Sequence, residues 1–345
     1  MLNIISLSVL RDKVTWPGKV VKNLIKGLDI LWYPYVINKS FDTTSRLWIH
    51  DDVRAINRLG DIPENTKVII GPNLYNLHAI PKEPNFLDIP YIMPCSWIID
   101  FWKTFGYSGK LISWPTWIDT DLFAPSEWEK TSVLVYIKKR FPEEKAFIFQ
   151  LLATKSIPYS CIEYGSYRES DFKVALQKAK YVIWVGCPET QWVALWEILS
   201  SNIPILLWDA RVLWHWFPSN ESDASLFTPE EKQFSPVTSA PYFDESCGKR
   251  VFSEIEIPEA IDFMELSWKN FTPRKYILEN LSLAKQARDF IDLYDTHYGL
   301  TFIDGMKEWW RTTMMKSYHY SWLWKCVFSI YDSKPFQKLF HLIFR

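Results

Sequence analysis

Residues 181–209, YVIWVGCPETQWVALWEILSSNIPILLWD, decide the fold. The run Tyr181–Val185 is apolar throughout and predicts a strand that is buried on both faces. A turn at 186–189 leads into a predicted helix near Gln191–Ser200, and a second apolar run follows at Ile203–Trp208. Strand, helix and strand in this order form a βαβ unit, so the sequence predicts a parallel sheet.

Two carboxylates lie at defined places in this unit. Glu189 is at the carboxyl end of the first strand, and Glu197 is about two turns further along the predicted helix. The free backbone N–H groups that open a helix can hold an anion. We therefore expect a ligand site at this edge, with Glu189 at its rim and Glu197 suited to accept hydrogen bonds from ribose hydroxyls.

The alternation of short apolar runs and helical patterns extends outward in both directions. In the first half, strands are predicted at Asn3–Val9, Ile30–Val36, Ser45–His50, Lys67–Gly71 and Tyr91–Met93, with helices at Lys19–Leu28 and Asp52–Leu59. In the second half, further strands are predicted at Ser132–Ile137 and Tyr159–Tyr164, and further helices near Glu143–Thr154, Ser170–Ala179 and Glu279–Tyr294. Residues 219–246 are polar and predict an irregular surface segment.

Two such series predict an α/β chain of two Rossmann-like domains, with parallel sheets that face each other across a cleft. Ligands bind such sheets at the carboxyl ends of the strands. We expect a first domain at 1–115, a linker at 116–130, a second domain at 131–300 and C-terminal helices at 301–345. A length of 345 residues suits two domains.

The composition argues against several classes of function. The net charge is −1, whereas a nucleic-acid-binding chain normally carries a strong basic excess. The five cysteines lack any CxxC spacing, which argues against a disulfide scaffold or a zinc site. No run approaches 18 uninterrupted apolar residues, so we expect no membrane-spanning helix and a cytoplasmic location. Aromatic residues make up 17% of the chain, which fits sugar stacking as well as ordinary core packing.

Three consecutive cations, Lys138, Lys139 and Arg140, directly follow the first predicted strand of the second series. At the carboxyl end of a strand they are placed to neutralise a phosphate, which arginine binds through two parallel hydrogen bonds. A solvated surface run is the alternative, and the sequence does not indicate which of the three points inward.

The βαβ unit at 181–209, with its Glu-x7-Glu pair, resembles the nucleotide-binding half of the group 1 (family 4-like) retaining glycosyltransferases of the GT-B fold. Residues 117–125, with the pattern Trp-Ile-Asp-x3-Phe-x-Pro, are similar to the interdomain linker of that family. Residues 16–19, Trp-Pro-Gly-Lys, resemble its glycine-rich first loop. Gln191 and Trp192 stand where the family usually has a Phe-Gly pair.

The resemblance implies a role for each candidate residue. Glu189 would lie beside the donor sugar as a catalytic group, and Glu197 would bind the ribose. The implied donor-binding set is Lys138, Lys139, Arg140, Glu197, Thr190, Gln191, Trp192, Gly18 and Tyr167. On the acceptor side, the ends of two predicted strands carry His50 with residues 51–52, and residues 71–73. His50 is the candidate catalytic base, and a structural or solvated histidine is the alternative.

No metal or cofactor is expected. Residues 119–121, Asp-Thr-Asp, resemble the DxD metal motif of the other large glycosyltransferase fold, but that motif belongs at the end of a nucleotide-domain strand and not in a linker. The sequence contains no GxGxxG, Walker or GxSxG pattern, so redox, ATPase and serine hydrolase chemistry lack support. The expected co-substrate is a UDP- or GDP-sugar.

Together these features predict metal-independent transfer of a sugar from a nucleotide-diphosphate sugar to a hydroxyl of a glycan or lipid-linked acceptor, with retention. A sugar-nucleotide epimerase on the same fold and a noncatalytic sugar-binding scaffold are the alternatives. Residues 306–345 contain seven Lys or Arg, two Asp or Glu and eleven aromatic residues. The part at 318–345 suits peripheral contact with an anionic membrane, and packing on the two domains or on a partner chain is the equal alternative.

Overall fold

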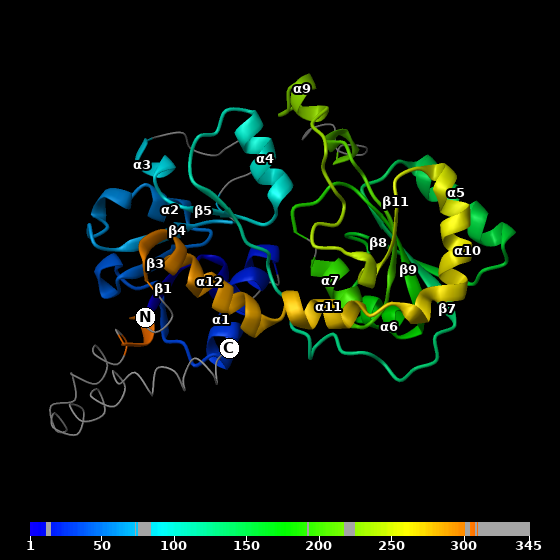
Figure 1. The fold of residues 1–345 in the computed structure, drawn as a ribbon, viewed down its shortest axis with the longest axis horizontal. Coiled ribbons are helices and arrows are strands. Elements are labelled where there is room, and N and C mark those ends of the chain that lie inside the picture. The colour runs from blue at the N-terminus through cyan, green and yellow to red at the C-terminus, as the bar shows by residue number, and fades with distance from the viewer. Residues whose placement is uncertain are drawn as a thin grey trace.

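The computed structural model describes residues 1–11, 15–72, 74, 84–191, 193–216, 225–300, 304–307 and 309. Two parallel β-sheets, each covered by helices, lie side by side (Figure 1). The predicted α/β class, with two Rossmann-like domains, is confirmed.

The first sheet has six strands in the order β2-β1-β3-β4-β5-β6, and each neighbouring pair is parallel. The strands are β1 (Leu2–Ile5), β2 (Tyr35–Ile37), β3 (Arg46–Ile49), β4 (Lys67–Ile70), β5 (Tyr91–Met93) and β6 (Leu111–Ser113). The helices are α1 (Trp16–Ile30), α2 (Val53–Ile56), α3 (Pro84–Leu87) and α4 (Ser96–Thr104), with 3₁₀ turns η1 (Ser8–Leu10), η2 (Phe41–Thr43) and η3 (Leu59–Asp61). Strands β1 and β3 are buried along their whole length, as short apolar runs between helical layers should be.

Several details of the first domain differ from the sequence prediction. The helix expected at Asp52–Leu59 spans only Val53–Ile56, and α4 was not predicted. The strand expected at Ile30–Val36 is displaced to β2, because α1 continues to Ile30. The second half of the strand expected at Asn3–Val9 contains η1 instead. Strand β6 was missed, since its three residues are only half-buried or exposed and form no apolar run long enough to stand out.

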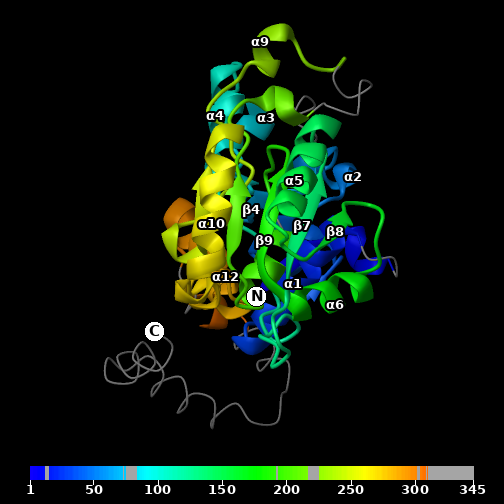
Figure 2. The same cartoon turned by 90° about the vertical axis from the view of Figure 1, so that its right-hand side faces the viewer.

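The second sheet has five parallel strands in the order β11-β10-β9-β7-β8. They are β7 (Ser132–Lys138), β8 (Tyr159–Glu163), β9 (Ala179–Gly186), β10 (Ile205–Trp208) and β11 (Gly248–Val251). One face packs on α5 (Pro142–Thr154) and α10 (Ile257–Ser267), which stand in front of β7 and β9 in Figure 2. The other face packs on α6 (Glu169–Lys178), α7 (Val193–Ser200) and α11 (Pro273–Asn280). The described part of the expected irregular segment, 225–246, contains only the short helix α9 (Pro229–Lys232) and the start of η5 (Glu245–Cys247).

The linker region passes from one core to the other within a few residues. Trp114 and Trp117 pack in the core of the first domain, whereas Ile118 and Phe123 pack in that of the second. The Ile118 N–H donates to the carbonyl of Leu281 at 3.2 Å, so the outgoing and returning chain segments lie side by side between the domains.

Helix α12 (Leu283–Tyr298) carries the chain back onto the first domain, where it packs along α1 (Figure 1). Gly27 allows the close approach, because a Cβ at that position would lie 2.5 Å from the backbone oxygen of Leu283. The C-terminal helices expected at 301–345 fall almost entirely outside the described residues.

Membrane contact was predicted for residues 318–345, which lie outside the described residues. Among the helices that the structure describes, none has both the length and the apolar character needed to cross a bilayer.

Candidate functional site

The carboxyl ends of β7 and β9 bring the predicted Lys138 and Glu189 together. Lys138 pairs with Gly186 in the sheet register, and Glu189 follows three residues later. The Lys138 Nζ lies 2.5 Å from the Glu189 Oε1 and 4.1 Å from the centre of the Tyr164 ring. Burial by itself would lower the pKa of Lys138, but the Glu189 carboxylate outweighs it and the pKa lies above the ordinary value of a lysine. The side chain therefore keeps its positive charge at this edge of the sheet.

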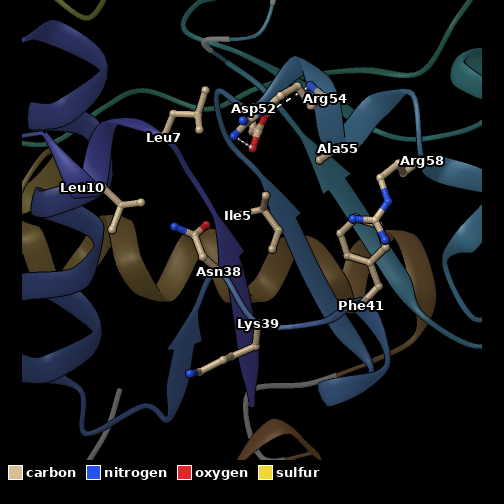
Figure 3. Close-up of a pocket in the computed structure, with 10 residues that line it drawn as sticks. All are labelled: Ile5, Leu7, Leu10, Asn38, Lys39, Phe41, Asp52, Arg54, Ala55 and Arg58. Carbon is tan, nitrogen blue, oxygen red and sulfur yellow. Dashed lines mark hydrogen bonds and ion pairs between the residues drawn. The ribbon is translucent and has the colours of Figure 1, made fainter.

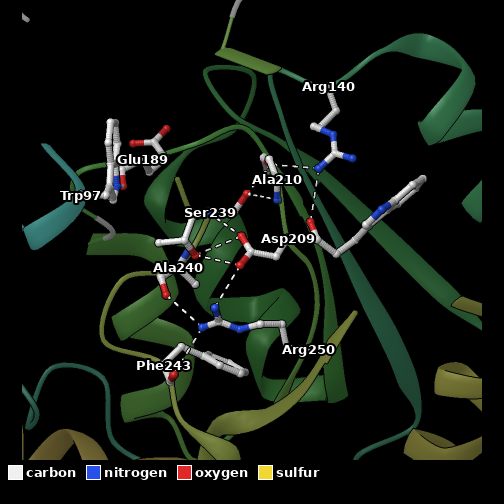
Figure 4. Close-up of polar contacts among 12 residues, drawn as sticks. Trp97, Arg140, Glu189, Asp209, Ala210, Ser239, Ala240, Phe243 and Arg250 are labelled. Carbon is white, nitrogen blue, oxygen red and sulfur yellow. Dashed lines mark hydrogen bonds and ion pairs between the residues drawn. The ribbon is translucent and has the colours of Figure 1, made fainter. Parts of the chain in front are cut away.

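The other two predicted cations have different surroundings. The Arg140 guanidinium donates to the carbonyl oxygens of Gly186, at 3.1 Å, and Trp208, at 3.2 Å (Figure 4). It thereby ties together the ends of β9 and β10. It also pairs with Glu144. Lys139 has a backbone φ of +48°, and its ammonium makes no ion pair within the part of the chain that the structure describes. Only Lys138 of the three is placed directly against Glu189.

Glu197, in the middle of α7, is 4% exposed and forms an ion pair with Lys19 of the first domain at 3.0 Å. Burial raises the pKa of Glu197, and the nearby Lys19 ammonium opposes that rise. Lys19 lies in the first turn of α1, one residue after the predicted Gly18. The pair therefore joins the predicted first loop to the predicted ribose-binding residue across the two domains.

Gln191 lies just before α7 and is 5% exposed. Neither atom of its side-chain amide has a hydrogen-bond partner among the described residues. Its neighbour Thr190 is half-buried, and Trp192 lies outside the described residues. A buried amide without a partner is costly in a protein interior, so the surroundings of Gln191 are those of a group that a bound molecule would complete.

Two further predicted donor-binding residues lie near these groups. The Tyr167 hydroxyl is 3.1 Å from that of Tyr136, and burial raises the pKa of Tyr167, with Glu197 adding to the rise. Gly18 is buried in the opening turn of α1, where its N–H donates to the Thr15 hydroxyl at 3.2 Å.

Trp97 of the first domain also reaches this edge, and the sequence analysis missed it. It stands in the first turn of α4, directly after β5, and its indole N–H donates to the backbone oxygen of Glu189 at 2.8 Å (Figure 4). A tryptophan shortly after a strand of the first sheet was the only sequence signal, and it did not indicate which surface the indole would meet.

His50, the predicted catalytic base, has no exposed surface. Its Nδ1 is 3.2 Å from the Ser6 hydroxyl and 3.4 Å from the Asp51 carboxylate, and its ring lies against Trp48. Burial lowers the pKa of His50 more than Asp51 raises it, so the imidazole is neutral at pH 7. The surroundings are those of a structural histidine, and a role in catalysis remains a prediction.

The Asp119 carboxylate lies 2.8 Å from the Lys26 ammonium and accepts the N–H groups of Asp121 and Leu122, so it caps a turn of the linker. Within the described ranges, no group of three or more His, Cys, Asp or Glu side chains is arranged to hold a metal ion.

A second polar network supports the loop that follows β10. The buried Asp209 carboxylate accepts hydrogen bonds from Thr238 and Arg250, and Ser239 donates to the carbonyl of Gly186 at 2.8 Å (Figure 4). The Glu189 N–H in turn donates to the carbonyl of Thr238 at 3.1 Å. The loop therefore holds the backbone of Glu189 in place.

Comparison with known proteins supports the fold. No family model matches the sequence, and no curated protein is detectably similar to it. Among solved structures, sucrose-phosphate synthase from Thermosynechococcus elongatus aligns with a TM-score of 0.52 at 10% identity, covering 86% of this chain and 99% of that one. The catalytic domain of starch synthase IV from Arabidopsis thaliana, bound to ADP and acarbose, aligns with a TM-score of 0.51 at 10% identity, covering 87% and 99%. The chain therefore has the GT-B fold.

Proposed function

We propose that this protein is a glycosyltransferase that moves a sugar from a nucleotide-diphosphate sugar to a hydroxyl acceptor. One observation carries the proposal. In a GT-B fold, Lys138, Glu189 and Glu197 gather at the carboxyl edge of the second sheet, directly opposite Lys19 and Trp97 of the first domain. Ligands of parallel α/β sheets bind at this edge.

The donor would lie between these groups. Lys138 would neutralise the departing diphosphate, together with the free N–H groups that open α7. Glu197 would accept hydrogen bonds from the ribose hydroxyls, in place of its contact with Lys19. Because these fixed charges serve the leaving group, the proposal needs no metal ion. Retention of the anomeric configuration is part of the proposal and follows from the family resemblance of residues 181–209.

Calorimetry and product analysis test the proposal. The protein is titrated with UDP, GDP and ADP, and then incubated with the matching nucleotide sugars. We expect one nucleotide to bind, and Glu197→Ala to lose that binding while the protein stays folded. Glu259→Ala, at an exposed glutamate on α10, is the matched control and should bind as before. Binding of no nucleotide would refute the proposal, and formation of an isomerised nucleotide sugar instead of free nucleotide would identify an epimerase.

A further inference from the structure

A cavity of about 440 Å³ opens at the carboxyl ends of β1, β2 and β3 in the first domain (Figure 3). Ile5 ends β1, and Asn38 and Asp52 follow β2 and β3 within one to three residues. The volume suits a small ligand or one end of a larger one. None of the groups proposed to bind the donor lines this cavity.

The lining combines an apolar part with a basic part. The apolar part consists of Ile5, Leu7, Leu10, Phe41 and Ala55, and the basic part of Lys39, Arg54 and Arg58. Leu10 is 72% exposed, which is unusual for a leucine side chain and leaves apolar surface available to a ligand. Asp52 is the single acidic residue in the lining.

The basic groups are held in position but are only weakly neutralised. Arg54 forms two hydrogen bonds of 3.0 Å with the carboxylate of Asp52. Arg58 lies over the ring of Phe41 and pairs with Asp61 at 2.9 Å. Both arginine side chains are largely exposed, and exposed ion pairs contribute about 0–1 kcal/mol, so an incoming anion can share or replace these contacts.

Lys39 adds a charge that the described residues do not balance, since its ammonium has no acidic partner among them. The lining has three cations and one carboxylate, and Asp61 balances Arg58 from outside the lining, so one positive charge remains at this cavity although the whole chain has a net charge of −1. An arginine fork of this kind fits the planar carboxylate and the phosphate group.

The cavity opens at the edge of the first sheet that meets the second domain. Asp51, next to the lining residue Asp52, accepts the N–H groups of Leu7 at 2.8 Å and Ser8 at 3.0 Å, and so holds the segment between β1 and α1. That segment lines the cavity through Leu7, and it leads into the helix whose Lys19 contacts the second domain. The cavity therefore lies on the edge of the first sheet from which Lys19 and Trp97 reach the donor groups of the second domain.

The geometry points to a specific class of acceptor: this cavity binds the acceptor through an anionic group, a phosphate or a carboxylate, that lies beside an apolar portion of the molecule. The inference rests on the proposed glycosyltransferase function. It adds the chemistry of the acceptor, which the donor site leaves open.

Isothermal titration calorimetry of the full chain, without nucleotide, tests the inference with three ligands that share an octyl chain and a hexose ring. Octyl β-D-glucoside is neutral, octyl β-D-glucuronide carries a carboxylate, and octyl β-D-glucoside 6-phosphate carries a phosphate. We expect at least one charged ligand to bind ten-fold or more tightly than the neutral one, and the stronger of the two identifies the anion. The preference should shrink in 0.5 M NaCl, because salt screens exposed charges.

Two variants test whether the basic residues of the cavity cause the preference for charged ligands. The double substitution Lys39→Gln/Arg58→Gln should reduce the preference to less than three-fold, whereas Lys103→Gln, at an exposed lysine near the end of α4, should leave it unchanged. Equal affinities for the three ligands, no saturable binding of any of them, or a preference that survives the double substitution overturns the inference. Nucleotide titrations of the same protein report separately on the proposed function: nucleotide binding without an anion preference rejects only the acceptor class.

Discussion

Replacing the buried Gln191 by leucine should stabilise the free protein and weaken its binding of the donor. Both amide atoms of Gln191 lack a hydrogen-bond partner among the described residues, at an exposure of 5%. An unpaired buried polar group costs about 1–3 kcal/mol. Leucine has a similar volume and no polar atom, so Gln191→Leu removes this cost. Since 1 kcal/mol shifts the melting temperature of a domain of 150–250 residues by about 2–4 °C, we expect a rise of about 2–12 °C.

The second half of this prediction concerns the donor. If a bound nucleotide sugar supplies partners for the amide, the variant loses them, and each lost hydrogen bond of about 0.5–1.5 kcal/mol weakens affinity by about 2- to 12-fold. Scanning calorimetry of the free protein measures the first effect, and titration with the nucleotide that binds measures the second. The stabilised protein should therefore be the weaker binder.

Gln286 provides the matched control, because it is a glutamine of α12 that is 2% exposed. Its amide oxygen also lacks a partner among the described residues, but its amide nitrogen donates to the carbonyl of Asn280. Gln286→Leu loses this contact, so it should stabilise the protein less than Gln191→Leu and leave donor binding unchanged. A Gln191→Leu variant that melts below the parent and binds nucleotide as well as the parent would show that this amide serves packing only.

Three further predictions concern Lys138, the buried Glu197 and the packing of α1 on α12. Lys138→Gln should weaken UDP or GDP binding at least ten-fold in calorimetry but leave binding of the free nucleoside unchanged, because only the diphosphate would contact the ammonium. Equal losses of affinity for the nucleotide and the nucleoside would contradict this role. Burial raises the pKa of Glu197, so the stability that this group contributes is present below the ordinary glutamate pKa of about 4.3 and is lost as the pH rises through the higher folded value. In urea unfolding, the free energy of unfolding of Glu197→Gln should therefore exceed that of the parent by more at pH 7 than at pH 5. Gly27→Ala should lower the free energy of unfolding by about 1–3 kcal/mol despite alanine's helix propensity, because its Cβ would meet Leu283. Gly60→Ala, which has open space around it, is the control and should not lower it. A stabilised Gly27→Ala would disprove the close packing of α1 on α12.

The long strands of the second domain were the most predictable part of the fold, for a physical reason, whereas β11 (Gly248–Val251) was missed. Strand β7 is seven residues long and β9 eight, and nearly all of their residues are buried, so apolar runs stand out in the sequence. The first sheet has strands of three or four residues, and β2 and β6 are only partly buried. Such short runs are hard to distinguish from the ends of helices, which is why the expected second strand, Ile30–Val36, began at the last residue of α1 and included only the first two residues of β2.

The site was predictable where one chain segment determines it. The spacing of Glu189 and Glu197 places one residue at the end of a strand and the other on the following helix, and the structure has both there. Which cation faces Glu189 depends on backbone details after β7, and there the structure selects Lys138 and turns Arg140 towards the carbonyl groups of β9 and β10. These details involve residues far apart in sequence, which local patterns do not encode.

The contacts between the domains involve different atoms of the two glutamates, the backbone oxygen of Glu189 and the carboxylate of Glu197. Trp97 binds the backbone oxygen of Glu189, so its contact leaves the carboxylate to Lys138 and can persist when a donor is bound. Lys19 binds the Glu197 carboxylate itself, which is the group that the ribose hydroxyls would need. Under the proposed function, a nucleotide would have to replace Lys19 at a buried carboxylate whose charge is costly without a partner. Binding of the ribose and separation of α1 from α7 should then be coupled, because the same carboxylate cannot satisfy both partners fully.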